Sequence, residues 1–322
     1  MRRRILLACA CAAGVPLASF VSPAFAQPDL TQKAGPSVAD APSDSYRFDR
    51  FELDSADGGR RYRVQLAVPR AAPPPSGFPV LYLLDGNAAF AALTQAQLAS
   101  MAAQDPPLVI AAIGYATDLR FDLAARTYDY TPPVPEGGVA SAAASADAAR
   151  GRRTGGADVF LDLIETRIKP AVETRTTIDL ARQSLWGHSY GGLFVLHTLL
   201  NRPKAFQTYI AADPSLWWAD GFILRDNAAL PVDGVRLLVM TGGAQTPVRA
   251  DGPAGVDPAT VARVQQARRA APPDAAQRFV ARQAQRPGVQ ARLREFDGIA
   301  HGPMLALSLG PAIDLAAGTG PP

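Results

Sequence analysis

Residues 185–196 read Leu185-Trp186-Gly187-His188-Ser189-Tyr190-Gly191-Gly192-Leu193-Phe194-Val195-Leu196. A Gly-x-Ser-x-Gly core therefore stands between a short apolar run and an apolar segment of helical character. This order of strand, tight turn and helix is typical of a nucleophile elbow. Gly187 and Gly191 are expected to flank Ser189 because a Cβ at either position would collide as the chain reverses. The pattern makes Ser189 a candidate nucleophile.

A serine hydroxyl reacts slowly until a base accepts its proton, so a histidine is required. The chain offers three histidines. His188 precedes the serine, so its side chain should leave the turn on another side, and we keep it as a candidate substrate contact. His197 lies eight residues into the following helix. His301 comes just after the last expected strand, where this topology delivers a base, and elimination favours it.

The third catalytic group should be a carboxylate that orients the imidazole and stabilises its charged form. Asp213 ends an expected strand and lies between Ser189 and His301 in the usual Ser–Asp–His order, so we rank it first. Asp251 and Asp257 follow the next strand and are the alternatives. A site without any carboxylate also remains open at this point.

The oxyanion of an acyl-transfer intermediate needs preorganised N–H donors. The backbone amide of Tyr190, directly after the candidate nucleophile, is one. The second is expected from the loop after the third strand, where Gly86 or Asn87 can turn an amide toward the site. The segment Asp85-Gly86-Asn87 is also an ordinary turn sequence.

Hydrophobic patterning predicts an α/β-hydrolase fold with helices on both faces of the sheet. The first two runs alternate apolar and polar residues around Asp57-Gly58-Gly59, as an antiparallel hairpin does. Later runs are continuously apolar and separated by helical segments, which indicates parallel strands. The expected strands span 46–53, 62–68, 80–84, 108–113, 184–186, 209–212, 235–240 and 289–296, and the expected helices include 158–173, 258–285 with a break at Pro272-Pro273, and 304–315.

Residues 1–26 are predicted to be a secretory signal peptide, with three arginines, an apolar stretch and Ala24-Phe25-Ala26 before the cleavage point. Export by the general or the twin-arginine route remains open. Residues 27–44 are predicted to be a disordered leader, and 45–322 a single domain. Within it, residues 132–156 are rich in Ala, Gly, Pro and Ser, which predicts a flexible insert and a candidate lid.

Composition narrows the possible partners. Removal of residues 1–26 would leave 29 basic residues (32 less the three arginines) against 29 acidic ones. Such a chain has no global charge that favours nucleic acid or a membrane surface. Both cysteines, Cys9 and Cys11, lie in the segment predicted to be removed, so no disulfide or thiolate metal site is expected. We therefore expect a periplasmic or secreted protein without stable membrane insertion.

Several further segments carry a family resemblance that is more selective than Gly-x-Ser-x-Gly. The sequence resembles the esterase family of α/β-hydrolases that includes the periplasmic ferric-enterobactin and salmochelin trilactone esterases of Gram-negative bacteria. The similarity spans roughly residues 45–310. The segments that carry it are Tyr82-Leu83-Leu84-Asp85-Gly86-Asn87, Arg126-Thr127-Tyr128-Asp129-Tyr130-Thr131-Pro132, Gly155-Gly156-Ala157, the elbow itself, Pro214-Ser215-Leu216-Trp217-Trp218 and His301-Gly302.

The resemblance implies hydrolysis of an ester or lactone, and most specifically of a ferric catecholate trilactone, through a serine acyl-enzyme. No metal or organic cofactor is expected; iron would arrive with the substrate. Such a large aromatic anion suits Arg126 as a charge partner and Trp217 and Trp218 as stacking surfaces. A general carboxylesterase, an acyltransferase and a catalytically silent binding protein are the alternatives.

Two positions depart from the pattern of this family. It usually carries Ser where this chain has Asp213, and often Glu where this chain has Gln245. Some relatives are understood to use a Ser–His dyad, so the identity of the third residue is the open question of the site.

Overall fold

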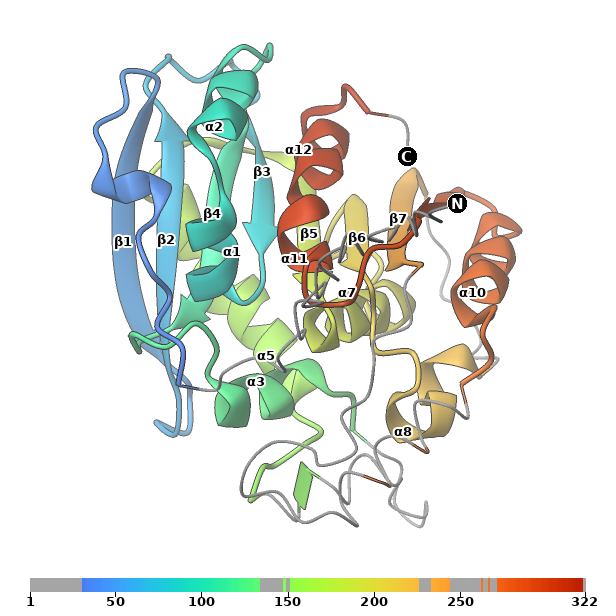
Figure 1. Ribbon diagram of the computed structural model, residues 1–322. Coiled ribbons are helices and arrows are strands. Elements are labelled where there is room, and N and C mark those ends of the chain that lie inside the picture. The colour runs from blue at the N-terminus through green and yellow to red at the C-terminus, as the bar shows by residue number, and fades with distance from the viewer. Residues whose placement is uncertain are drawn as a thin grey trace, which may run out of the picture.

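The computed structural model describes residues 31–133, 147–148, 151–225, 233–243, 262, 266 and 271–320. Its centre is an eight-stranded sheet with the order β1-β2-β4-β3-β5-β6-β7-β8 (Figure 1). The strands are β1 (Tyr46–Asp54), β2 (Arg61–Pro69), β3 (Phe78–Leu83), β4 (Val109–Tyr115), β5 (Ile178–His188), β6 (Thr208–Ala212), β7 (Val235–Gly242) and β8 (Val289–Phe296).

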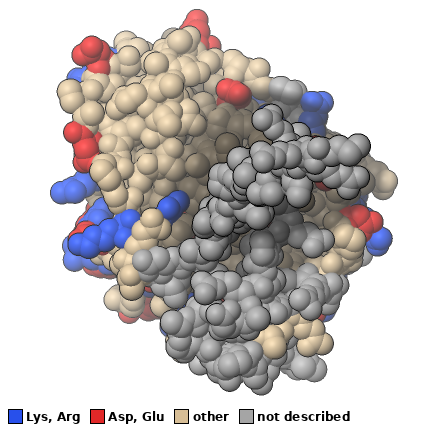
Figure 2. All heavy atoms as spheres, in the orientation of Figure 1, with Lys and Arg blue, Asp and Glu red and all other residues tan. Residues whose placement is uncertain are grey.

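Strand β2 runs antiparallel to both β1 and β4, and all later pairings are parallel. The predicted α/β-hydrolase architecture, with an antiparallel hairpin followed by parallel strands, is therefore confirmed. The hairpin forms one edge of the sheet, at the left of Figure 1. Along this edge basic and acidic side chains are interspersed (Figure 2); Glu52, for example, pairs with Arg61 at 3.1 Å and with Arg63 at 3.0 Å.

Helices cover both faces of the sheet because the side chains of its inner strands alternate between two apolar cores. On β3, Val80 and Tyr82 enter one core, whereas Leu81 and Leu83 enter the other. The first core lies under α3 (Leu123–Tyr130), α5 (Ala157–Leu163), α6 (Lys169–Glu173), α7 (Tyr190–Asn201), α8 (Trp218–Gly221) and α10 (Ala275–Ala284), and the second under α1 (Gly86–Ala92), α2 (Gln95–Ala102), α11 (Met304–Leu307) and α12 (Leu309–Ala317).

Two predicted helices are interrupted. The helix expected over 158–173 is α5 and α6 joined by the π-helical segment η2 (Ile164–Ile168). The helix expected over 304–315 is divided into α11 and α12 at Ser308, whose hydroxyl accepts the Nε1–H of Trp186 at 3.1 Å. Of the helix expected over 258–285, most of residues 258–270 lie outside the described residues, and α10 begins only after Pro272-Pro273.

Residues 31–44 are ordered against the sheet domain, which differs from the predicted disordered leader. Lys33 forms a β-bridge with Leu119, and the amide of Ala34 donates to Asp118 O at 2.9 Å. The 3-10 turn η1 (Val38–Asp40) is closed by a capping box, and Val38 is buried in the second core. Burial of Val38 offsets part of the entropy that is lost when this mostly polar segment becomes ordered.

One further short helix, η3 (Phe222–Leu224), follows α8.

Other predictions fall partly or wholly outside the described residues. These are the signal peptide at 1–26, residues 27–30 of the leader, and residues 134–146 and 149–150 of the predicted insert. Within the described ranges, no helix combines the length and the apolar character needed to cross a membrane.

Candidate active site

Ser189 occupies a strained turn between β5 and α7. Its φ of 61° and ψ of −118° lie in a region that L-residues seldom adopt. A Cβ at Gly187 would lie 2.4 Å from the backbone of Gly191, so glycine is required there as predicted. The expectation for Gly191 is wrong, because a Cβ there would make only ordinary contacts, the nearest at 3.5 Å. The tighter position is Gly192, 3.0 Å from Pro214 Cα.

The structure brings Ser189, His301 and Asp213 together. His301 Nε2 lies 3.0 Å from Ser189 Oγ, and His301 Nδ1 lies 2.6 Å from Asp213 Oδ2. An ionised carboxylate only accepts, so Nδ1 carries the imidazole proton and Nε2 is free to accept from the serine hydroxyl. The side chains of His301 and Asp213 are 33% and 21% exposed. A substrate in solvent can therefore reach the arrangement.

The three groups meet because their strands end at the same edge of the parallel sheet. Ser189 follows β5, Asp213 follows β6, and His301 follows β8. Asp213 has a φ of 42°, its amide donates to Met240 O at 2.6 Å, and its Oδ1 accepts from Gly242 N at 3.3 Å. The alternatives Asp251 and Asp257, and the departure at Gln245, lie outside the described residues.

Ser215 is a neighbour of the nucleophile that sequence patterning did not single out. Its Oγ lies 3.4 Å from Ser189 Oγ, and its amide donates to Ser189 O at 3.1 Å. The side chain is 2% exposed. Its position three residues after β6, the strand that neighbours β5, was the available signal, but Pro214-Ser215 reads locally as an ordinary turn.

The loop between β3 and α1 lies beside the elbow. A Cβ on Gly191 would be 3.5 Å from Leu84 Cβ and 3.8 Å from Asp85 Oδ2. Gly86 opens α1 and Tyr190 opens α7, and amides in the first turn of a helix have no intrahelical acceptor. A Cβ on Gly86 would come within 2.6 Å of the β4 backbone, so no side chain fits there.

Asn87 uses its side chain to organise the loop after β4. Its Nδ2 lies within 3.1 Å of three carbonyl oxygens, and its Oδ1 accepts from the amide of Tyr115 at 3.2 Å. The carboxamide is thus engaged in structure, which leaves the backbone amides of this loop as the candidate oxyanion donors. The three carbonyls belong to Tyr115, Thr117 and Leu119.

Arg126, predicted to meet the charge of a substrate, forms a buried ion pair instead. Its Nε and Nη2 lie 2.8 and 2.9 Å from the two carboxylate oxygens of Asp85. Asp85 adopts a left-handed φ of 51°, and its amide donates to the hydroxyl of Tyr130 at 2.9 Å. Helix α3 therefore fixes the loop that precedes Gly86 through two side chains. Spacing alone could not separate this role from substrate binding, because the partner lies 41 positions away.

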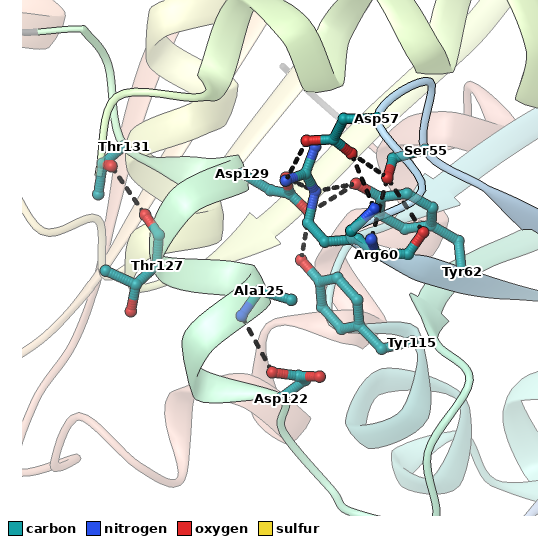
Figure 3. Close-up of polar contacts among 11 residues, drawn as sticks. Ser55, Asp57, Arg60, Tyr62, Tyr115, Asp122, Ala125, Thr127, Asp129 and Thr131 are labelled. Atoms are coloured by element: carbon teal, nitrogen blue, oxygen red, sulfur yellow. Dashed lines mark hydrogen bonds and ion pairs between the residues drawn. The ribbon is translucent and has the colours of Figure 1, made fainter. Parts of the chain in front are cut away.

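A second buried carboxylate, Asp129, fastens α3 to the sheet (Figure 3). The hydroxyls of Tyr62 and Tyr115 donate to its Oδ2 at 2.9 and 3.0 Å, and Arg60 Nε lies 3.0 Å from its Oδ1. Burial raises the pKa of Asp129 to about 7, against the opposing effects of Arg60 and the two tyrosines. These contacts hold α3 on β2 and β4, and so stabilise the helix that carries Arg126 and Tyr130.

The predicted aromatic contacts separate into two kinds. Trp218 is fully buried in the first core, so its assignment to substrate binding is wrong. Trp217 is only partly buried and packs against Tyr190 with ring centroids 6.1 Å apart. Tyr190 also donates its hydroxyl to Asp147 Oδ2 at 3.0 Å, which ties the predicted insert to the elbow.

The two remaining histidines do not contact Ser189 Oγ. His188 is 6% exposed, and its Nε2 lies 2.9 Å from the carbonyl oxygen of His301, which differs from the substrate contact predicted for it. His197 is buried in α7 and bonded to Asp158 at 2.7 Å, as expected for a residue outside the site. No cluster of three potential metal ligands occurs among the described residues.

The strand order and the elbow after β5 define the protein as an α/β-hydrolase. Within that class the chain belongs to the family described as "Putative esterase", whose model matches residues 55–298. It is therefore an esterase, and the sequence-based resemblance to this family is confirmed.

The chain is also similar to individual proteins whose names state an esterase or hydrolase activity. The chain is 42% identical to the apo-salmochelin esterase of Escherichia coli O6:H1 over 226 residues, which cover 68% of each protein. It is 40% identical to the ferri-bacillibactin esterase BesA of Bacillus subtilis over 177 residues, 54% of this chain and 60% of that protein. Its structure is similar to that of the enterobactin hydrolase IroE in complex with DFP, with a TM-score of 0.66, 36% identity, and coverage of 87% of this chain and 99% of the other.

Proposed function

We propose that this protein is an exported serine esterase that hydrolyses the ester bonds of a catecholate siderophore trilactone. The salmochelin, bacillibactin and enterobactin enzymes to which it is similar all act on siderophores by their names. The observation that carries the proposal is the chain of short contacts from Asp213 through His301 to Ser189.

In the first half of the reaction, Ser189 Oγ attacks the ester carbonyl while its proton passes to His301 Nε2. Asp213 stabilises the imidazolium that forms. The C–O bond to the leaving alcohol then breaks, and His301 returns the proton to that oxygen. In the second half, water attacks the serine ester with His301 again as base, which releases the acid and restores Ser189.

The negative charge on the tetrahedral intermediate would be met by two backbone amides, those of Tyr190 and Gly86. Both open helices whose first-turn amides lack intrahelical acceptors. Arg126 and Tyr130 hold the Asp85 turn that precedes Gly86. Their part in this mechanism is therefore to fix the geometry of the donor loop, which removes reorganisation cost at the moment of reaction.

Recognition of catechol rings would fall to the partly exposed aromatic pair of Trp217 and Tyr190 beside the nucleophile. Arg120 is half-buried, and its Nη1 donates to the neutral side chain of Gln32 at 3.4 Å. It is a better charge partner for an anionic substrate than Arg126, whose guanidinium is already paired. The N-terminal residues 1–26 would deliver the enzyme to the periplasm or outside the cell, where a trilactone carrying iron would be met.

The test is product analysis by mass spectrometry with iron-loaded and iron-free triscatecholate trilactone, using the mature chain. The wild type should release linear and then monomeric catechoyl-serine species, and Ser189→Ala should release none. A p-nitrophenyl acyl ester run in parallel separates the alternatives. Equal or faster turnover of the simple ester would indicate a general carboxylesterase, and transfer to an added alcohol in preference to water would indicate an acyltransferase. A Ser189→Ala protein that still cleaves both the trilactone and the p-nitrophenyl ester would refute the mechanism.

A further inference from the structure

His188 makes two close contacts with His301, although neither involves the reacting atoms. Its Nε2 lies 2.9 Å from the carbonyl oxygen of His301, and the two imidazole rings lie 4.6 Å apart with a tilt of 37°. A carbonyl oxygen can only accept, so the Nε2 of His188 carries a proton and donates it. The side chain is 6% exposed, which keeps water from competing for this hydrogen bond.

This hydrogen bond joins the segment that carries the base to the strand that carries the nucleophile. His301 lies in the seven-residue segment, 297–303, that connects β8 to α11. In this stretch Ile299 N donates to Phe296 O at 3.2 Å, a contact that fixes the turn but not the distance to β5. His188 is the last residue of β5 and directly precedes Ser189. The His188 side chain therefore links the end of β5, next to Ser189, to the backbone of His301.

The ring of His188 is also suited to the charge that develops on His301. Burial, then the neighbouring His301, Arg126 and Arg120, lower the pKa of His188 well below its ordinary value, so it stays neutral. When His301 accepts the serine proton, its imidazolium lies beside an uncharged ring, which does not repel it. A cationic side chain at position 188 would oppose the same step.

We propose that His188 is a positioning residue for His301: it holds the base within reach of both Ser189 and Asp213 through a main-chain hydrogen bond and a closely packed, tilted imidazole ring. The expected effect of His188 on turnover rests on the proposed serine-esterase function. The placement of His301 itself can be measured without any substrate.

The chain has three histidines, so ¹⁵N-histidine labelling gives three imidazoles to assign by NMR. His301 should show a proton on Nδ1 with a strongly downfield signal from its 2.6 Å bond to Asp213, whereas His188 and His197 should carry theirs on Nε2. In His188→Phe, which keeps a ring but no donor, the His301 signal should broaden or disappear. The His197 signal, from a residue bonded to Asp158 and Asn201, should not move and reports an intact fold.

Kinetics supply the second measurement. In His188→Phe, kcat should fall about 10- to 100-fold with KM changed less than about two-fold, because a misplaced base slows chemistry and not binding. His188→Gln, which keeps an N–H donor, should recover part of that loss, whereas the donor-free His188→Met of similar size should not. His197→Gln is the matched control, a buried histidine in α7, and should retain wild-type kcat.

An unchanged His301 signal in His188→Phe, or equal kcat for the Gln and Met variants, would overturn the inference. The Gln and Met pair keeps the comparison available if the Phe variant does not fold. Absence of esterase activity in the wild type would instead contradict the proposed function. The downfield proton of His301 and its response to position 188 would still test the positioning role.

Discussion

His301 Nδ1 lies 2.6 Å from Asp213 Oδ2, a distance that belongs to a charge-assisted hydrogen bond. The carboxylate is itself held by the Gly242 amide at 3.3 Å. The imidazole therefore has one fixed tautomer and one fixed orientation toward Ser189. This chain therefore has the geometry of a complete Ser–His–Asp triad.

The role of this carboxylate is testable by Asp213→Asn. The carboxamide can present an N–H to His301 and so favour the wrong tautomer, and we expect kcat to fall by about 10² to 10⁴ with little change in KM. Steady-state kinetics on an ester substrate measure this. Asp297→Asn, an exposed carboxylate on the segment leading to His301, is the control and should retain activity. An Asp213→Asn enzyme with more than half of wild-type kcat would indicate that the dyad suffices.

Gly86→Ala tests the second oxyanion donor. The added Cβ would come within 2.6 Å of backbone atoms of Ala112, Ile113 and Gly114, none of which can move without displacing β4. The first turn of α1 must shift instead, and loss of one aligned donor typically costs about 10²- to 10³-fold in kcat.

Gly310→Ala, in α12 with nothing within 4 Å of the added Cβ, is the matched glycine control. It should leave kcat unchanged and raise stability by up to about 1 kcal/mol. Equal kcat for Gly86→Ala and the wild type would exclude the amide of Gly86 from the oxyanion site.

Arg126→Met separates a structural ion pair from a substrate contact. Removal of the guanidinium leaves the buried carboxylate of Asp85 without its partner, which typically costs about 3–5 kcal/mol of unfolding free energy. Urea denaturation should show this loss. Arg278→Ala, whose exposed side chain pairs with Asp274, should cost less than about 1 kcal/mol. A raised KM with unchanged unfolding free energy in Arg126→Met would restore the substrate-binding assignment.

Lys169 should make stability depend on pH in the alkaline range. Its Nζ donates to Ala205 O and lies 3.9 Å from the ring centroid of Phe206. Burial, opposed by Glu165 and Glu173, lowers the pKa of Lys169 from 10.5 to about 8. The unfolded chain then binds more protons than the native one between pH 8 and 10.5, so this group makes the protein more stable as pH rises through that window.

The comparison with Lys169→Met isolates this contribution from other titrating groups. The unfolding free energy of the wild type relative to the variant should increase from pH 7.5 to pH 10, as measured by urea denaturation at each pH. A constant difference across the range would show that the lysine titrates alike in both states.

Much of the fold could be predicted because its signals are local. The apolar runs predicted at 184–186 and 235–240 and the alternation in Tyr46–Leu53 follow from burial on two faces or on one. The run at 184–186 lies in the buried second half of the longer strand β5. Strand β8 has the predicted bounds of Val289–Phe296. The ordered segment at 31–44 could not be predicted, since Val38 is one apolar residue in a mostly polar stretch and is buried by the second core, whose other residues come from distant elements.

Within the candidate site, residue chemistry and chain order were sufficient to select Ser189 and His301, because few residue types can act as nucleophile and base and the chain has only three histidines. The identity of the acid was left open among three aspartates, and the roles of Arg126, Trp218 and His188 were assigned to substrate. Only the tertiary structure distinguishes among the candidate acids and shows what these three side chains contact. Arg126 pairs with Asp85, His188 contacts His301, and Trp218 lies inside the core. These contacts depend on the order of the strands across the sheet, which brings together residues that are far apart in the sequence.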